Sequence, residues 1–140
     1  MRSLLLLLAA VPLIALAAPT TTPVADRAAG DESAAQRLVA LATRQDTVAE
    51  TDPRVQRASG QLAKAIRNTG ETETAIATAC IRAARFLFDA TRAQATALEV
   101  LDAVAEKGAG RPLSDTIGRY VEARRNTKGK THAEAMGALK

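Results

Sequence analysis

Apolar residues recur at helical spacing throughout the chain after residue 30. In residues 31–50, Leu38, Leu41 and Val48 mark one apolar face, and Asp31 and Ser33 are candidate caps. A second stripe follows between Asp52 and Gly70, where an aspartate cap, a proline at the first helical position and a terminal glycine enclose a helix. These patterns predict helices over about 31–50 and 53–69.

The region from about residue 72 to 107 contains neither glycine nor proline. Its apolar positions alternate steps of four and three, which is the heptad spacing of helical bundles. The seam comprises Ile76, Cys80, Ala83, Leu87, Ala90, Gln94, Ala97, Leu101 and Val104. A second apolar stripe, which includes Ile81, Phe88 and Leu98, lies on another side. We therefore expect one helix, roughly 50 Å long, with neighbours on both sides.

Two shorter helices complete the expected fold. After the glycine-rich stop at 108–110, Ser114 caps a helix that carries Ile117, Tyr120 and Val121 and ends near Arg125. A capping box over residues 131–134 opens a short last helix. The sequence predicts an all-α domain over residues 31–140, a small bundle of about four helices with a long central third helix.

The first 17 residues have the anatomy of a secretory signal peptide. Arg2 precedes a short apolar run, and Ala15-Leu16-Ala17 forms an A-x-A cleavage site. The run is too short to cross a bilayer. We expect cleavage after Ala17, a disordered Pro/Thr-rich tether over 18–30, and a secreted or periplasmic product without a membrane span.

The counts of cysteine and histidine argue against two kinds of structural site. The chain has one cysteine, Cys80, and one histidine, His132, so neither an internal disulfide nor a structural zinc site is expected. Cys80 is interpreted as a buried thiol that acts as a small apolar residue, with an intermolecular disulfide in a homodimer as the alternative. His132 lies in the capping box, where we expect a surface role. We predict no cofactor and no metal.

The formal net charge is +4, and basic residues gather on part of two helices. A binding face is predicted from five residues: Arg57, Lys64, Arg82, Arg85 and Arg92. They would adjoin if helices two and three formed a hairpin, whereas Glu99, Asp102 and Glu106 would form an acidic end. An ordinary solvated face of mixed charge is the alternative interpretation.

The C-terminal region superficially resembles a helix-turn-helix. Its basic residues are Arg119, Arg124, Arg125, Lys128 and Lys130. Export from the cytoplasm argues against nucleic acid as a partner, and any two amphipathic helices joined by a short turn produce this pattern.

The leading hypothesis is therefore a secreted or periplasmic helical protein that acts by binding. It would present its basic helical face to a protein or an anionic envelope polymer or lipid headgroup. No catalytic residues stand out, and an enzyme is not favoured. The alternatives are a small helical enzyme or ligand carrier with a pocket near Gln94, and a structural protein that self-associates through helix three.

Overall fold

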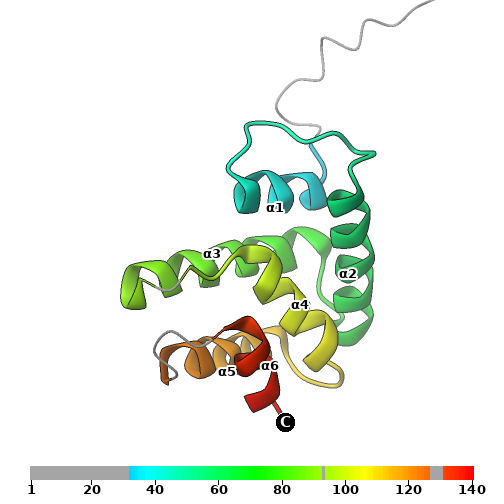
Figure 1. The fold of residues 1–140 in the computed structure, drawn as a ribbon. Coiled ribbons are helices and arrows are strands. Elements are labelled where there is room, and N and C mark those ends of the chain that lie inside the picture. Colours follow the sequence, from blue (N-terminus) through cyan, green and yellow to red (C-terminus); the bar gives the residue numbers. More distant parts are fainter. Residues whose placement is uncertain (1–31, 93, 127–130) are drawn as a thin grey trace, which may run out of the picture. The chain divides into compact units, whose positions relative to one another are not determined.

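The computed structural model describes residues 32–92, 94–126 and 131–140. The expected signal peptide over 1–17 and tether over 18–30 lie outside these residues. The described residues are all-α, with six helices and no strand: α1 (Ala34–Thr43), α2 (Pro53–Thr69), α3 (Glu73–Thr91), α4 (Ala97–Lys107), α5 (Leu113–Asn126) and α6 (His132–Ala138) (Figure 1). None of these helices is both long and apolar enough to cross a membrane.

The predicted long third helix is wrong, and with it the expected count of about four helices. α3 ends at Thr91, and the next residue, Arg92, takes the left-handed conformation with φ of 57°. α4 begins after Thr96. The Thr96 hydroxyl accepts a hydrogen bond from the backbone amide of Glu99, and the Glu99 carboxylate accepts one from the backbone amide of Thr96. This capping box stabilises a new helix start, so the chain breaks although it holds no glycine or proline there.

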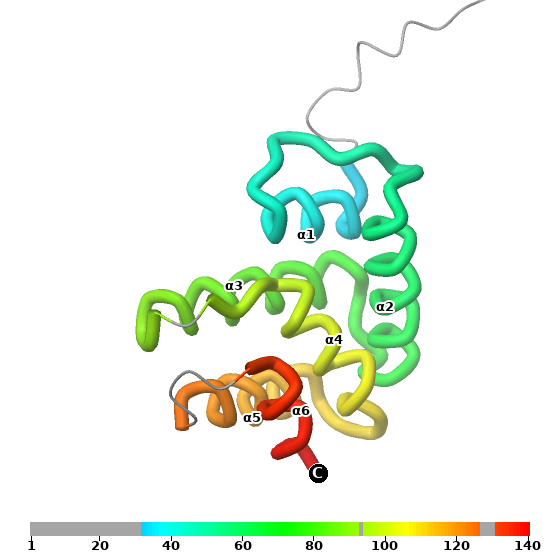
Figure 2. Tube along the Cα trace, viewed as in Figure 1, coloured from blue at the N-terminus to red at the C-terminus, as the bar shows by residue number. Residues whose placement is uncertain are grey.

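The break lets the chain fold back, and α4 becomes the central helix. It contacts α1, α2, α3 and α5 (Figure 2). More than half of its residues are buried: Ala97, Val100, Leu101, Ala103, Val104 and Ala105. The two ends of the predicted heptad seam are buried as expected, whereas Ala90 and Gln94, near the break, are exposed.

The first helix is shorter than predicted. Ser33 caps it as expected, in a capping box with Gln36. Helix α1 nevertheless ends at Thr43, before a left-handed Arg44, and residues 44–52 form a loop. The Gln36 side chain donates to the carbonyl oxygen of Val48 at 2.9 Å, and Val48 is buried. The loop thus keeps Val48 in the core and pairs its carbonyl oxygen with a side chain of α1.

The other helix boundaries follow the sequence signals closely. α2 has Asp52 as its cap, Pro53 in its first turn and Gly70 in the left-handed conformation at its end. α6 follows the capping box of Thr131 and Glu134. α5 begins at Leu113, so Ser114 lies inside the helix and the prediction that it caps the helix is wrong.

Side chains of α2 bind α4 along one edge. Figure 1 shows α2 crossing the end of α3 rather than running alongside it. Three α2 side chains donate to α4 groups at 2.6, 2.7 and 2.8 Å: Gln61 to Asp102, Lys64 to Glu106 and Asn68 to the Ala105 carbonyl. The spacing of 61, 64 and 68 places these donors on one face of α2.

Candidate functional site

The structure places the five predicted basic residues beside several different hollows and partners. Arg57 lines a small polar hollow between α2, α4 and α6. Lys64 pairs with Glu106 at 2.7 Å. Arg82 lines a groove between α3 and α5, and Arg85 lines a different hollow beside α1. Arg92 lies over the ring of Phe88, a lining residue of that same hollow.

The acidic stretch expected at the far end of a long helix instead faces α2. Because α4 folds back, Glu99 and Asp102 line the hollow that contains Arg57, and Glu106 accepts from Lys64. Arg57 and Lys64 of α2 therefore lie beside carboxylates. Arg85 lines the hollow beside α1, and Arg92 lies over the ring of Phe88, which lines the same hollow.

The hollow beside α1 brings together residues that the sequence analysis treated separately. We call it the Gln94 hollow; its volume is about 670 Å³. Its polar lining residues are Arg44, Arg85, Gln94 and Thr96, and its apolar ones are Leu41, Ala42, Ile81, Ala84, Phe88, Ala95 and Ala97. Gln94, expected inside the helical seam, is exposed in the link between α3 and α4. None of these described lining residues carries a carboxylate.

Cationic groups dominate the electrostatics of the Gln94 hollow. The guanidinium of Arg92 lies 5.6 Å from the centroid of the Phe88 ring, within the range of a cation–π interaction. Thr96 and Ala97 bring the start of α4 to the hollow. The Glu99 carboxylate caps this helix start by accepting from the Thr96 amide, so the positive charge of the hollow comes from its arginines. These features favour an anion.

The backbone around the Gln94 hollow is unusual at two positions. Arg44 and Arg92 have φ of 55° and 57°, and no other non-glycine residue in the described ranges has a positive φ. Both end helices, where an arginine also complements the helix dipole. A left-handed conformation at a residue with a Cβ costs about 1–2 kcal/mol, and such strain concentrates at functional sites.

Large apolar side chains are exposed at the same place. Leu41 is 54 % exposed and Phe88 is 45 % exposed. Together with the two arginines that line the wall, they make a hollow that is cationic and apolar at once.

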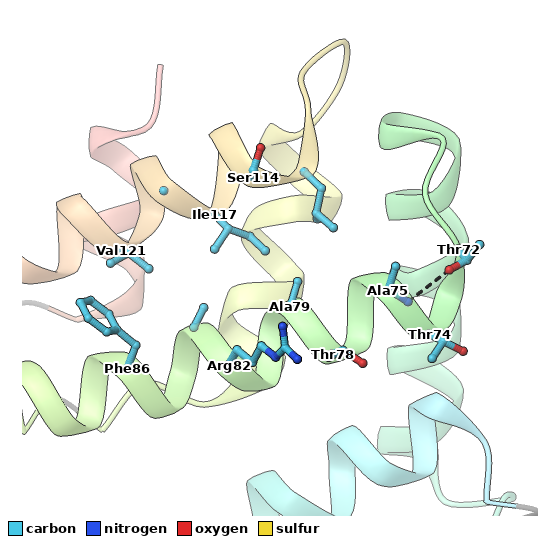
Figure 3. A pocket seen from close by; sticks show the side chains of 13 residues that line it. Thr72, Thr74, Ala75, Thr78, Ala79, Arg82, Phe86, Ser114, Ile117 and Val121 are labelled. Atoms are coloured by element: carbon cyan, nitrogen blue, oxygen red, sulfur yellow. Dashed lines mark hydrogen bonds between the residues drawn. The ribbon is translucent and has the colours of Figure 1, made fainter.

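The α3–α5 groove is larger and more apolar than the Gln94 hollow. Its volume is about 860 Å³, and Figure 3 shows Phe86 of α3 pointing toward Val121 of α5 across it. Among the described residues that line it, Arg82 alone carries a charge. Phe86 is 48 % exposed, so this groove leaves a large aromatic side chain open to solvent.

The polar hollow contains a chain of hydrogen bonds that the sequence analysis missed. Tyr120 Oη lies 2.8 Å from Nδ1 of His132, and Nε2 of His132 lies 2.9 Å from Oδ2 of Asp102. Gln61 donates to the other oxygen of Asp102 at 2.6 Å. His132 is thus half-buried between helices, not a surface residue as expected. No short-range signal links residues so far apart in the sequence.

The geometry of this chain favours a structural role. Both ring nitrogens of His132 are hydrogen-bonded, so neither faces a reactant in the hollow. A general base must have a nitrogen within hydrogen-bond reach of the proton that it removes. Burial raises the pKa of the Tyr120 phenol well above its usual range, which keeps the hydroxyl protonated as a donor.

Cys80 lies fully buried on α3. Burial raises the pKa of its thiol to about 12, which leaves almost no thiolate at neutral pH. These observations favour the interpretation as a small apolar residue. A disulfide between two chains would require α3 to leave the core.

The arginines of α5 lie in different surroundings. Arg119 pairs with Asp115 at 3.2 Å, Arg124 is 7 % exposed, and Arg125 lies over Phe86 at 5.8 Å from the ring centroid. Lys128 and Lys130, the remaining residues of the suggested helix-turn-helix, lie outside the described residues. The described arginines do not form a common phosphate-binding face.

Within residues 32–92, 94–126 and 131–140, no three metal-ligating side chains gather into a group that would hold an ion. Comparison with known protein families, with curated proteins and with solved structures found no match to this chain. Function is therefore inferred from the geometry of the sites.

Proposed function

We propose that the protein acts by binding, and that its ligand is a small anionic molecule with an apolar part, held in the Gln94 hollow. One observation carries this proposal. Arg85 and Gln94, which belonged to separate hypotheses, line the same hollow beside the exposed ring of Phe88, and none of the described lining residues carries a carboxylate.

The lining residues suit such a ligand chemically. Guanidinium groups such as those of Arg44 and Arg85 bind carboxylates, phosphates or sulfonates through paired hydrogen bonds. Gln94 adds an amide that both donates and accepts. Leu41 and Phe88 supply apolar area for the uncharged part of the ligand. A volume of about 670 Å³ is typical of small-molecule sites.

This proposal modifies the leading hypothesis from the sequence. It keeps an exported binding protein with an anionic partner, and it keeps Arg85 and Arg92. It replaces a flat basic face with a hollow, because Arg57 and Lys64 face the carboxylates of α4. The carrier with a pocket near Gln94 and the binder of anions thus become a single proposal.

Two dyes of similar shape test the proposal. Anilinonaphthalene sulfonate carries an anionic group, and N-phenylnaphthylamine is its neutral counterpart. We expect Arg85→Gln to weaken binding of the anionic dye by roughly ten-fold or more, because a hydrogen bond to a charged group contributes about 1.5–3 kcal/mol. The neutral dye should bind almost unchanged. Phe88→Ala should weaken both.

Arg82→Gln is the matched control. It removes the same charge from the same helix, but its side chain lines the α3–α5 groove. If Arg82→Gln and Arg85→Gln reduce binding of the anionic dye equally, the dye responds to total charge, and the proposed site is wrong.

A further inference from the structure

The α3–α5 groove has the length and shape to hold a helix. Its α3 wall runs from Ala75 to Phe86, which is about 17 Å, or three helical turns. Its α5 wall carries Ile117 and Val121, both directed toward α3 (Figure 3). Two neighbouring helices present parallel ridges of this kind to a third helix.

Small residues leave room for a close approach. Ala75 and Ala79 lie on the α3 wall and Gly118 on the α5 wall. A Cβ placed on Gly118 would meet no atom within 4 Å, so the space over this residue is open. Phe86, half exposed at one end, is the kind of aromatic anchor that dominates binding energy in protein interfaces.

The charges beside the α3–α5 groove favour an acidic partner. Arg82 lines the groove, and the guanidinium of Arg125 lies 5.8 Å from the centroid of the Phe86 ring. None of the described residues that line the groove is acidic. If two such grooves paired about a two-fold axis near Arg82, this arginine would lie near its own equivalent, which is unfavourable.

We propose that the α3–α5 groove is a docking site for an acidic amphipathic helix of a partner protein. The apolar face of that helix would cover Phe86, Ile117 and Val121, and its carboxylates would meet Arg82 and Arg125. This is recognition of a helix in a groove, with apolar contacts for affinity and charge for selectivity. The site is separate from the Gln94 hollow, and either would stand without the other.

The test uses the chain as isolated from cells and a designed peptide of about 18 residues, enough for five helical turns. The peptide has leucine at heptad spacing, alanine elsewhere on the apolar side and glutamate on the polar side. Its twin carries lysine in place of glutamate. We expect the glutamate peptide to bind at least ten-fold more tightly than its twin, with shifts in the amide NMR signals of α3 and α5. Arg82→Glu should reduce this preference.

Glycine substitutions locate the binding. Gly118→Leu fills the groove and should raise the dissociation constant of the glutamate peptide at least ten-fold. Gly60→Leu is its matched control, since Gly60 lies within α2, outside the groove, and also has open space at its Cβ position. Both changes favour helix, so circular dichroism should show an intact fold for each.

Three results would overturn the proposal. The first is a glutamate peptide that does not saturate or binds no better than its twin. The second is equal binding by the Gly118→Leu and Gly60→Leu variants. The third is a dimer in sedimentation experiments that Gly118→Leu disrupts, which would assign the groove to a second copy of the chain.

Discussion

Nε2 of His132 lies 2.9 Å from Oδ2 of Asp102, although thirty positions separate the two residues. This contact joins α6 to the central helix α4, and Tyr120 extends it to α5 through Nδ1 of the same ring. Gln61 adds α2. The imidazole thus joins α4, α5 and α6 directly, and α2 through Asp102.

The hydrogen-bond chain should contribute cooperatively to stability. His132→Ala would leave the buried hydroxyl of Tyr120 without its partner, at a cost of about 1–3 kcal/mol in the free energy of unfolding. Adding Tyr120→Phe should cost less than the sum of the two single changes, by at least about 0.5 kcal/mol. Urea unfolding of the two single variants and the double variant measures this coupling.

Arg119→Ala serves as the control for this cycle. Its partner Asp115 is on the same helix and both side chains are largely exposed, so we expect a loss below about 1 kcal/mol. Strictly additive effects of the Tyr120 and His132 changes would contradict the proposed coupling.

The central position of α4 predicts which leucine contributes most to the free energy of unfolding. Leu101 is fully buried, whereas Leu41 is 54 % exposed. Leu101→Ala should lower the free energy of unfolding by about 2–5 kcal/mol, because it leaves a cavity. Leu41→Ala should change it by less than about 1 kcal/mol. Similar urea midpoints for the two variants would contradict a central α4.

The cap of α2 predicts a dependence of stability on pH. The hydrogen bond from the Arg54 side chain, with further help from its backbone amide, lowers the pKa of Asp52 to about 2. The folded state therefore favours the ionised carboxylate. This contribution is complete above the usual pKa of about 4 and is lost as the pH falls from there to about 2.

Thermal unfolding of an Asp52→Asn variant isolates this effect. Asparagine still caps the helix but carries no charge. The native chain should melt above the variant near neutral pH, and the difference should shrink between about pH 4 and pH 2. A difference that stays constant with pH, or that is matched by Asp46→Asn in the preceding loop, would exclude the Asp52–Arg54 pair as its cause.

Cys80 should be unreactive until the protein unfolds. Its thiol is buried and its pKa is raised to about 12, so both access and thiolate concentration are low. We expect slow labelling by a disulfide reagent in buffer and fast labelling across the urea transition. The elution volume on a sizing column should be the same with and without reductant. Rapid labelling of the folded chain would restore the intermolecular disulfide as an explanation.

The predicted signal peptide sets the expected mass of the mature protein. Expression in a bacterial host with periplasmic export should yield a chain that begins at Ala18, because Ala15-Leu16-Ala17 precedes the expected cleavage site. Mass spectrometry of the periplasmic fraction measures this directly. An intact Met1 on protein from the cytosol would remove export from the proposal, although the Gln94 hollow and the α3–α5 groove would keep their geometry.

Local signals in the sequence correctly identified several elements. Asp52, Pro53 and Gly70 bound α2, and Thr131 with Glu134 opens α6. Each of these signals acts through hydrogen bonds or dihedral preferences within about four residues, so neighbouring residues suffice to predict it. The same holds for Thr96 and Glu99: their capping-box pattern is present in the sequence, but the absence of glycine and proline favoured a continuous helix.

The positions of the candidate sites follow from the break between α3 and α4. Because the chain turns between Arg92 and Thr96, Glu106 meets Lys64, and Gln94 lies beside Arg85 instead of within a helical seam. A continuous helix would have kept the basic and acidic stretches apart. The sequence by itself therefore determined the all-α class and most helix starts through short-range capping. Only the tertiary structure decided which charges are paired and where the hollows lie, because those contacts join residues that are distant along the chain.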